Sequence, residues 1–212
     1  MPLHILDNKL WFPPVEDALD DGLLAAGGDV SVNRLLLAYS KGIFPWYDGP
    51  VPLWWCPDPR FVLFPEELII SKSMKALLQK DAFTFTINHA FPAVIHHCKE
   101  QPREGQNGTW ITDELETSYN QLHCQGHAHS AEAWVNGKLC GGLYGVRRGK
   151  VFFGESMFSL VSNASKFALI RLVSELQKKG VELVDCQVHT NHLTSMGARM
   201  ISRKEFLKFL ES

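Results

Sequence analysis

The middle of the chain alternates hydrophobic and polar residues with the period of two that is typical of β-strands. Strands are predicted near residues 128–135, 139–147 and 150–155, separated by an Asn136-Gly137 hairpin turn and an Arg148-Gly149-Lys150 turn. A further buried strand is predicted near residues 181–188. An antiparallel meander that is followed by a helix and another strand indicates an α+β fold.

Polar residues that precede hydrophobic positions at helical spacing predict the helices. Two helices are expected near residues 89–100 and 113–125, and two others end at Gly42 and Gly180. The expected capping residues are Ser31, Ser71, Asn88, Thr112, either Ser162 or Asn163, and Ser202, the last of which forms a capping box with Glu205.

The first sixty residues differ in composition from the rest, because they are rich in proline, tryptophan and glycine. Prolines and three tryptophans between residues 44 and 59 predict an ordered loop there instead of a regular element. A domain boundary is therefore expected near Arg60. It divides the chain into a small N-terminal domain of residues 1–60 and a larger domain of residues 61–212.

The composition, 45% hydrophobic and 21% charged, is that of an ordinary globular protein. No stretch approaches the roughly 18 to 20 continuous apolar residues that cross a bilayer, and no signal peptide is evident at the amino terminus. The five cysteines lack paired spacing, which favours reduced thiols and a cytoplasmic location. The net charge of −2 does not indicate a general nucleic-acid binder.

Two acidic residues lie in unusually apolar sequence. Glu155 lies among aromatic and apolar side chains, and Asp185 follows a buried strand and precedes Gln187 by two residues. In a regular strand the side chains of Asp185 and Gln187 share one face. Apolar surroundings predict a perturbed carboxylate, and such groups concentrate at functional sites.

Five segments carry a resemblance to a known family. They are Gly42-Ile43-Phe44-Pro45-Trp46, Leu53-Trp54-Trp55-Cys56-Pro57-Asp58-Pro59-Arg60, Gly108-Thr109-Trp110-Ile111-Thr112, Phe153-Gly154-Glu155-Ser156-Met157-Phe158 and Val184-Asp185-Cys186-Gln187-Val188. In this order they resemble the bacterial leucyl/phenylalanyl-tRNA–protein transferases, and the similarity extends from about Phe12 to about Leu210.

The resemblance implies a small N-terminal domain followed by a GNAT-like acyltransferase domain with a mainly antiparallel sheet flanked by helices. It implies transfer of Leu or Phe, and less well Met, from aminoacyl-tRNA to proteins that begin with Arg or Lys, which marks them for N-degron proteolysis. It also implies a centre of Asp185, Gln187 and Glu155, with no cofactor, no metal and no membrane partner.

The same resemblance implies where the substrates bind. Trp46 and Trp110 are expected to contact the 3′-terminal adenosine of the tRNA, whereas Trp54 and Trp55 are expected to be packing residues. An apolar cavity for the donor side chain is expected from Leu143, Phe152, Leu169 and Leu172. Modest, salt-sensitive contacts to tRNA phosphates are expected from Lys72, Lys75 and Lys80 on the helix after Ser71.

Physical chemistry limits the roles of the three central residues. A Gln amide is not a base near neutral pH, so Gln187 is expected to orient groups by hydrogen bonding, with Asp185 fixing it. Asp185 or a water would receive the proton that the nucleophilic amine loses. Glu155 is a candidate to hold the ammonium group of the donor or of the acceptor, and the sequence does not choose between them.

Four alternatives stay open at this stage. The clusters at residues 123–129 and 186–192 contain histidines and cysteines that could bind a metal, although neither has CxxC or HExxH spacing. Cys186 could be a nucleophile, although the preceding acid would raise its pKa. An acyl-CoA acyltransferase would need a glycine-rich pyrophosphate turn, which residues 158–166 lack. A non-catalytic RNA-binding module would leave Asp185, Gln187 and Glu155 without a role.

Overall fold

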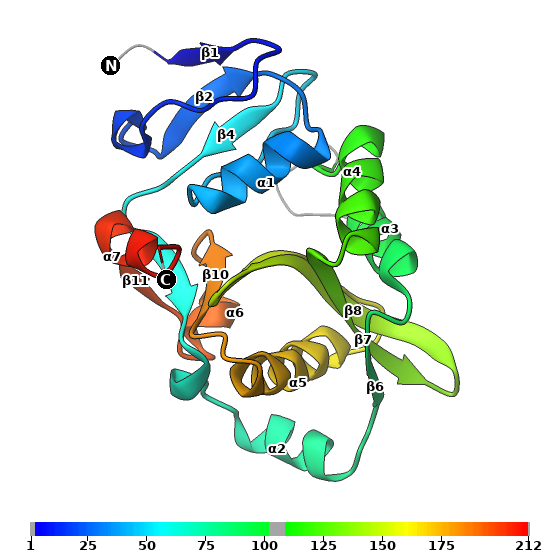
Figure 1. The fold of residues 1–212 in the computed structure, drawn as a ribbon. Helices are drawn as coiled ribbons and strands as arrows, with labels where there is room; N and C mark the ends of the chain where they lie inside the picture. The colour runs from blue at the N-terminus through cyan, green and yellow to red at the C-terminus, as the bar shows by residue number, and fades with distance from the viewer. Residues whose placement is uncertain (1–2, 102–108, 212) are drawn as a thin grey trace.

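The computed structural model describes residues 3–101 and 109–211, which form two β-sheets with helices packed around them (Figure 1). The smaller sheet has the order β1-β2-β4-β3, in which only β1 and β2 are parallel. Its strands are β1 (His4–Leu6), β2 (Leu23–Gly27), β3 (Phe44–Pro45) and β4 (Leu53–Trp55). The expected loop at residues 44–59 is therefore wrong in part, because β3 and β4 pair with each other there.

The larger sheet has the order β11-β5-β10-β9-β8-β7-β6 and contains a single parallel pair, β10 with β9. Its strands are β5 (Arg60–Leu63), β6 (Thr84–Ile87), β7 (Ala128–Val135), β8 (Lys138–Arg148), β9 (Val151–Ser159), β10 (Leu183–Gln187) and β11 (Arg199–Ile201). The predicted α+β class with a mainly antiparallel sheet is confirmed. The β9 strand continues four residues beyond its predicted end, because it pairs with β8 as far as Gly141.

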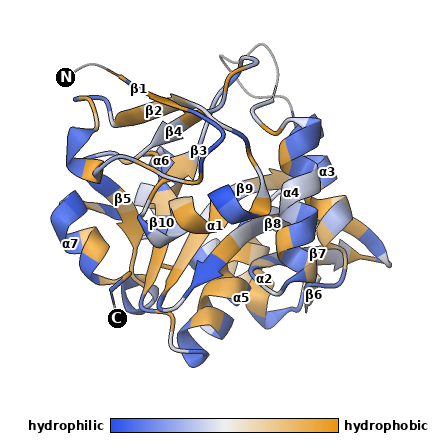
Figure 2. Cartoon of the chain, turned by 45° about the horizontal axis from the view of Figure 1, so that its top comes forward, coloured by the Kyte–Doolittle hydropathy of each residue, from blue (hydrophilic) through white to orange (hydrophobic). Residues whose placement is uncertain are grey.

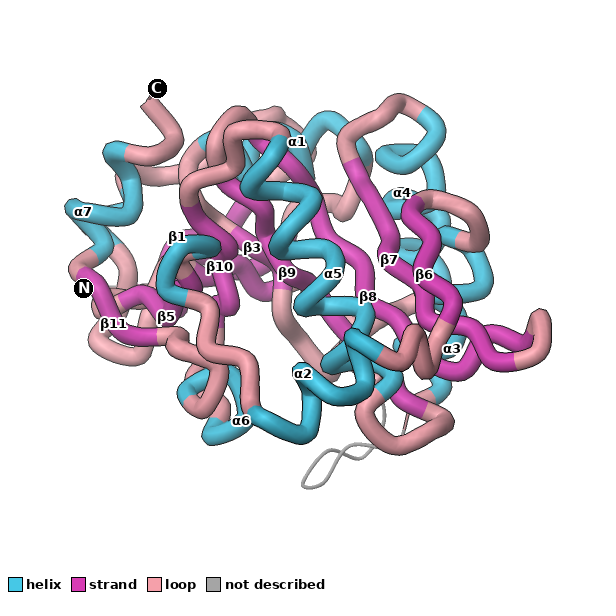
Figure 3. Tube along the Cα trace, turned by 90° about the horizontal axis from the view of Figure 1, so that it is seen from below, coloured by secondary structure: helices cyan, strands magenta, loops and turns pink. Residues whose placement is uncertain are grey.

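Helices cover both faces of the larger sheet. The helices are α1 (Val32–Ser40), α2 (Lys72–Gln79), α3 (Phe91–Glu100), α4 (Asp113–Cys124), α5 (Ala164–Lys178), α6 (Asn191–Thr194) and α7 (Arg203–Lys208), with short 3-10 turns at Val15–Asp17 and Pro65–Glu67. The α5 helix packs on one face with α2 beside it (Figure 3), and α3 and α4 pack on the other. None of the helices in the described ranges is long and apolar enough to cross a membrane.

Several predicted caps are confirmed. The side chains of Ser31, Ser71, Thr112 and Ser202 accept hydrogen bonds from backbone N–H groups in the first turns of α1, α2, α4 and α7. Asn88 is not a cap: it has a φ of 59°, its Oδ1 accepts from Ser130 N, and α3 begins only at Phe91.

The start of α5 also differs in detail from the prediction. Asn163 occupies the predicted position, but its left-handed backbone gives no side-chain cap. The Ser159 hydroxyl at the end of β9 accepts from Ser165 N instead, at 3.3 Å.

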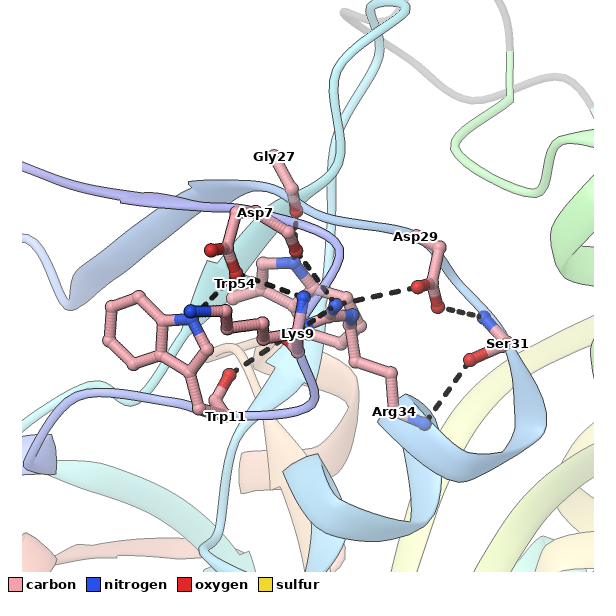
Figure 4. Close-up of polar contacts among 8 residues, drawn as sticks. All are labelled: Asp7, Lys9, Trp11, Gly27, Asp29, Ser31, Arg34 and Trp54. Carbon is pink, nitrogen blue, oxygen red and sulfur yellow. Dashed lines mark hydrogen bonds and ion pairs between the residues drawn. The ribbon is translucent and has the colours of Figure 1, made fainter.

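The N-terminal segment is fixed by one buried cation. The Arg34 side chain on α1 donates to the carbonyl oxygens of Asp7, Lys9 and Trp11 and forms an ion pair with Asp29 at 3.4 Å (Figure 4). Removing Arg34 would leave these carbonyls without donors, which is costly in a buried setting. Arg34 therefore holds residues 7–11 against α1.

Hydrophobic residues are concentrated in the strands of the larger sheet (Figure 2). One core cluster runs from the smaller sheet to the larger sheet, since Trp54 and Tyr39 belong to it together with Tyr144 and Phe153. The expected boundary near Arg60 falls between the last strand of the smaller sheet and the first strand of the larger one. Because the core is continuous there, the division into two domains stays a prediction.

Candidate active site

A pocket of about 490 Å³ opens where β9 and β10 stop pairing. The last parallel pair is Asp185 with Phe153, and beyond it the register of β10 against β5 shifts. Gln187, just beyond this pair, has a φ of 60°. This is a left-handed backbone conformation that residues other than glycine seldom adopt. Since a bulge interrupts the strand, the regular alternation expected for Asp185 and Gln187 does not hold, and the two side chains bond to different partners.

Glu155 lines this pocket and is 9% exposed. Its Oε1 accepts from Gln187 Nε2 at 3.0 Å, and its Oε2 accepts from the Tyr119 hydroxyl at 2.9 Å. Burial raises the pKa of Glu155 to about 7, against the opposing effect of these hydrogen bonds. The prediction of a perturbed carboxylate is confirmed for Glu155, and near neutral pH such a group can accept or release a proton.

Asp185 borders the pocket but is fully buried and bound by Arg60. Arg60 Nε and one terminal nitrogen donate to its two oxygens at 2.8 and 2.6 Å, and the backbone N–H of Gln187 donates to Oδ1 at 3.0 Å. The Arg60 guanidinium lies between the rings of Phe44 and Phe206, 4.7 and 4.6 Å from their centroids. Three donors therefore hold this buried carboxylate in one orientation.

Arg60 was not predicted as a site residue. It ends the Leu53–Arg60 segment of the family resemblance, but nothing in the local sequence indicates that its partner is 125 residues away. The signal that was available is a charged residue that begins an otherwise apolar strand, Arg60–Leu63.

The tryptophans fall into two groups. Trp46 is half-buried at the pocket, where its ring lies 5.6 Å from that of Trp55, and Trp110 lines the pocket with only 4% of its surface exposed. Trp54 is fully buried and donates to Gly27 O, which confirms the packing role expected for it. Trp55 is half-buried and donates to Trp46 O at 2.6 Å, so it supports the Trp46 backbone.

The apolar part of the pocket contains three of the four predicted residues. Leu143, Phe152 and Leu169 line it, whereas Leu172 is buried in the core under α5 and does not. Its apolar lining also includes residues that were not predicted for it: Met157, Val184 and Leu193. Met157 and Val184 come from β9 and β10, whose register could not be read from the sequence, and Leu193 comes from the short helix α6, which was not predicted.

Comparisons with known proteins show which family the chain belongs to. A family model described as leucyl/phenylalanyl-tRNA protein transferase matches residues 62–211, and the model of the N-terminal domain of that family matches residues 28–58. The chain belongs to this transferase family. A relative of that name from Christiangramia forsetii is 56% identical over 98% of this chain and all of its own length. Another, from Syntrophobacter fumaroxidans, is 54% identical over 99% of this chain and 90% of its own length.

Solved structures give only a distant likeness. A conserved protein of unknown function from Staphylococcus epidermidis aligns with a TM-score of 0.44 at 10% identity, over 85% of this chain and 68% of that one. The structure of L-PGS from Bacillus licheniformis aligns with a TM-score of 0.41 at 11% identity, over 79% of this chain and 54% of that one.

The predicted phosphate contacts lie away from the transferase pocket. Lys72, Lys75 and Lys80 are exposed on or just after α2, and none of them lines the pocket. Since α2 packs beside α5, these lysines can act only on parts of a substrate that extend beyond the pocket.

The geometry also bears on two alternatives. Burial, followed by the charge of Asp185, raises the pKa of Cys186 far above that of an ordinary thiol, which makes it a poor nucleophile. Within residues 3–101 and 109–211, no three His, Cys, Asp or Glu side chains are grouped closely enough to hold a metal ion.

Proposed function

We propose that this protein transfers Leu or Phe, and less well Met, from aminoacyl-tRNA to the α-amino group of proteins that begin with Arg or Lys, which marks them for N-degron proteolysis. One observation carries the proposal: a single pocket joins an apolar cavity to a buried carboxylate whose pKa is about 7. Membership of the transferase family supports it.

The apolar end of the pocket fits the donor side chain. A cavity of about 490 Å³ that includes Leu143, Phe152 and Leu169 accepts Leu, Phe or Met by shape and excludes charged side chains, because an unpaired charge is costly to bury. The aminoacyl ester would then lie toward Glu155, and Trp46 and Trp110 would contact the terminal adenine. The three lysines of α2 would contact phosphates further along the tRNA.

The reaction is aminolysis of an activated ester. The acceptor nitrogen forms a bond to the carbonyl carbon, the bond to the ribose oxygen breaks, and that oxygen takes up a proton as the nitrogen loses one. We propose Glu155 as the group that receives the proton from nitrogen and passes one to the leaving oxygen. The energy of the ester suffices, so ATP, metal and other cofactors have no part in the proposal.

Gln187 and Asp185 act through position in this mechanism. The Gln187 amide donates to Glu155, which leaves its carbonyl oxygen to accept an N–H of the reacting amine. Asp185 accepts from the Gln187 backbone and thereby holds the left-handed turn that aims this side chain. Asp185 is therefore assigned to positioning instead of proton transfer.

We also propose that the larger sheet is that of a GNAT-like acyltransferase domain. The proposal is supported by a mainly antiparallel sheet with one parallel pair, β9 and β10, joined through α5. The pocket opens at the end of that pair.

A transfer assay tests the proposed function. Purified protein is mixed with labelled Phe-tRNA and one of two peptides that differ only in beginning with Lys or Asp. Label is expected on the Lys peptide alone and without ATP. Leu-tRNA should also serve as donor, whereas Asp-tRNA and acetyl-CoA should not. Acetyl transfer from acetyl-CoA would instead establish an acyl-CoA acyltransferase, and binding of tRNA without transfer to any peptide would favour an RNA-binding module.

A further inference from the structure

Behind Glu155, on the side away from the pocket, lie two tyrosines from separate helices. Tyr119 on α4 donates its hydroxyl to Glu155 Oε2 at 2.9 Å, and the hydroxyls of Tyr39 and Tyr119 are 2.6 Å apart. Tyr39 comes from α1, which connects β2 to β3 of the smaller sheet, whereas Glu155 lies on β9 of the larger one. Both tyrosines are fully buried, and neither lines the pocket. A chain of hydrogen bonds therefore runs from the N-terminal part of the chain to the proposed proton acceptor.

Since the Tyr119 hydroxyl donates its proton to Glu155, the Tyr39 hydroxyl donates in turn to Tyr119. Burial, followed by the charge of Glu155, raises the pKa of both hydroxyls well above the usual range, so they keep their protons. A hydrogen bond donated to a carboxylate favours its ionised form. The bonds from Tyr119 and Tyr39 accordingly lower the pKa of Glu155, in opposition to its burial.

Other groups around Glu155 also raise or lower its pKa. The negative charge of Asp185 on β10 raises the pKa of Glu155, and the Gln187 amide lowers it by donating a hydrogen bond. Arg60 on β5 faces Asp185 and is paired with it. Tyr144 on β8 packs against Tyr119, with ring centroids 5.2 Å apart. Tyr119, with Tyr39 bonded behind it, thus donates to Glu155 from outside the pocket.

We propose that Tyr39 and Tyr119 are positioning residues of the transfer reaction, which hold the Glu155 carboxylate toward the pocket and favour the form that accepts a proton. The proposal rests on the proposed function, in which Glu155 accepts the proton of the attacking amine. It makes α1 a part of the active site, although no residue of α1 contacts the pocket.

The test replaces each hydroxyl by hydrogen. Tyr39→Phe, Tyr119→Phe and the double variant keep the rings that pack in the core. Tyr47→Phe is the matched control, because Tyr47 is also buried but its hydroxyl faces Thr112 at 3.5 Å. For each protein, kcat/KM for transfer from Phe-tRNA is measured against pH, and folding is checked by thermal unfolding.

Loss of the donors should raise the pKa of Glu155, so the fall of kcat/KM on the acid side should move to higher pH. We expect a shift of about one pH unit in the double variant, which is a loss of about tenfold at acidic pH and little loss at alkaline pH. The Tyr47→Phe profile should match that of the parent. An equal loss at every pH, or an unshifted profile in the folded variants, overturns the proposal.

A second measurement separates this proposal from the proposed function. The pKa of Glu155 is measured without substrate by NMR titration of carbon-13-labelled glutamates, and Glu155→Gln identifies its resonance. A pKa that rises in Tyr119→Phe and in Tyr39→Phe supports the electrostatic role even if no aminoacyl transfer occurs. An unchanged pKa contradicts it even if transfer occurs. If the double variant does not fold, the two single variants decide by the same criteria.

Discussion

The buried pair of Arg60 and Asp185 can be tested by replacing each partner with an apolar residue, Arg60→Met and Asp185→Leu, singly and together. Both side chains are fully buried and joined by two hydrogen bonds, so either single change leaves one uncompensated buried charge. Such a loss typically lowers the free energy of unfolding by about 3–5 kcal/mol. The double variant buries no charge at this place and should recover most of the stability, because apolar replacement of a buried pair is often neutral.

Stability and activity should separate in the double variant. Urea unfolding measures the free energy of unfolding of the parent, the two single variants and the double variant. The kcat/KM for transfer from Phe-tRNA is measured at a temperature where all the variants are folded. Transfer should stay about 100-fold or more below the parent even when stability returns, because the Gln187 backbone loses its acceptor on Asp185. If either single change lowers the free energy of unfolding by less than about 1 kcal/mol, Arg60 and Asp185 are not the strongly coupled buried pair described above. A double variant with full activity would refute the positioning role of Asp185.

Three further predictions concern substrate binding. Trp46→Ala should weaken binding of an aminoacyl-adenosine analogue by about 5- to 150-fold with a small change in melting temperature; Trp110→Ala should weaken it similarly but also destabilise the protein, because the ring is only 4% exposed. Leu169→Ala should change the ratio of kcat/KM for Phe-tRNA and Leu-tRNA by about tenfold, whereas Leu172→Ala should reduce stability by about 2–5 kcal/mol and leave that ratio unchanged. Alanine at all three lysines of α2 should weaken binding of whole aminoacyl-tRNA and flatten its salt dependence without affecting the adenosine analogue; equal losses for both ligands would place these lysines in the pocket instead.

Elements with strong local signals could be predicted from the sequence. The β7–β8 hairpin follows from alternating residues on either side of Asn136-Gly137, and α4 follows from the Thr112 cap and the apolar face that it precedes. The strands that escaped prediction are short or pair only with distant segments. For example, β5 lies between β11 and β10, which follow it by more than a hundred residues.

The site shows the same difference between residues with local sequence signals and residues that only distant contacts bring together. The approximate position of the site was evident from Glu155, Asp185 and Gln187, because polar residues in apolar segments are conspicuous locally. Their partners were not evident, since Tyr119 lies on an ordinary predicted helix and Arg60 on a strand that was not predicted, and both approach across the core. The left-handed turn at Gln187 was also hidden, because its cause is a register shift against β5.

The two acids show how distant residues decide local chemistry. Glu155 and Asp185 lie on neighbouring strands in apolar sequence, and from the sequence Asp185 or a water was expected to receive the proton, with Glu155 a candidate to hold an ammonium group. Asp185 meets the Arg60 guanidinium, and two hydrogen bonds fix the carboxylate against it. Glu155 meets neutral hydroxyl and amide donors, which offset only part of the effect of burial and leave its pKa at about 7. In the mechanism proposed above, the different partners therefore assign Asp185 to positioning its neighbours and Glu155 to proton exchange near neutral pH.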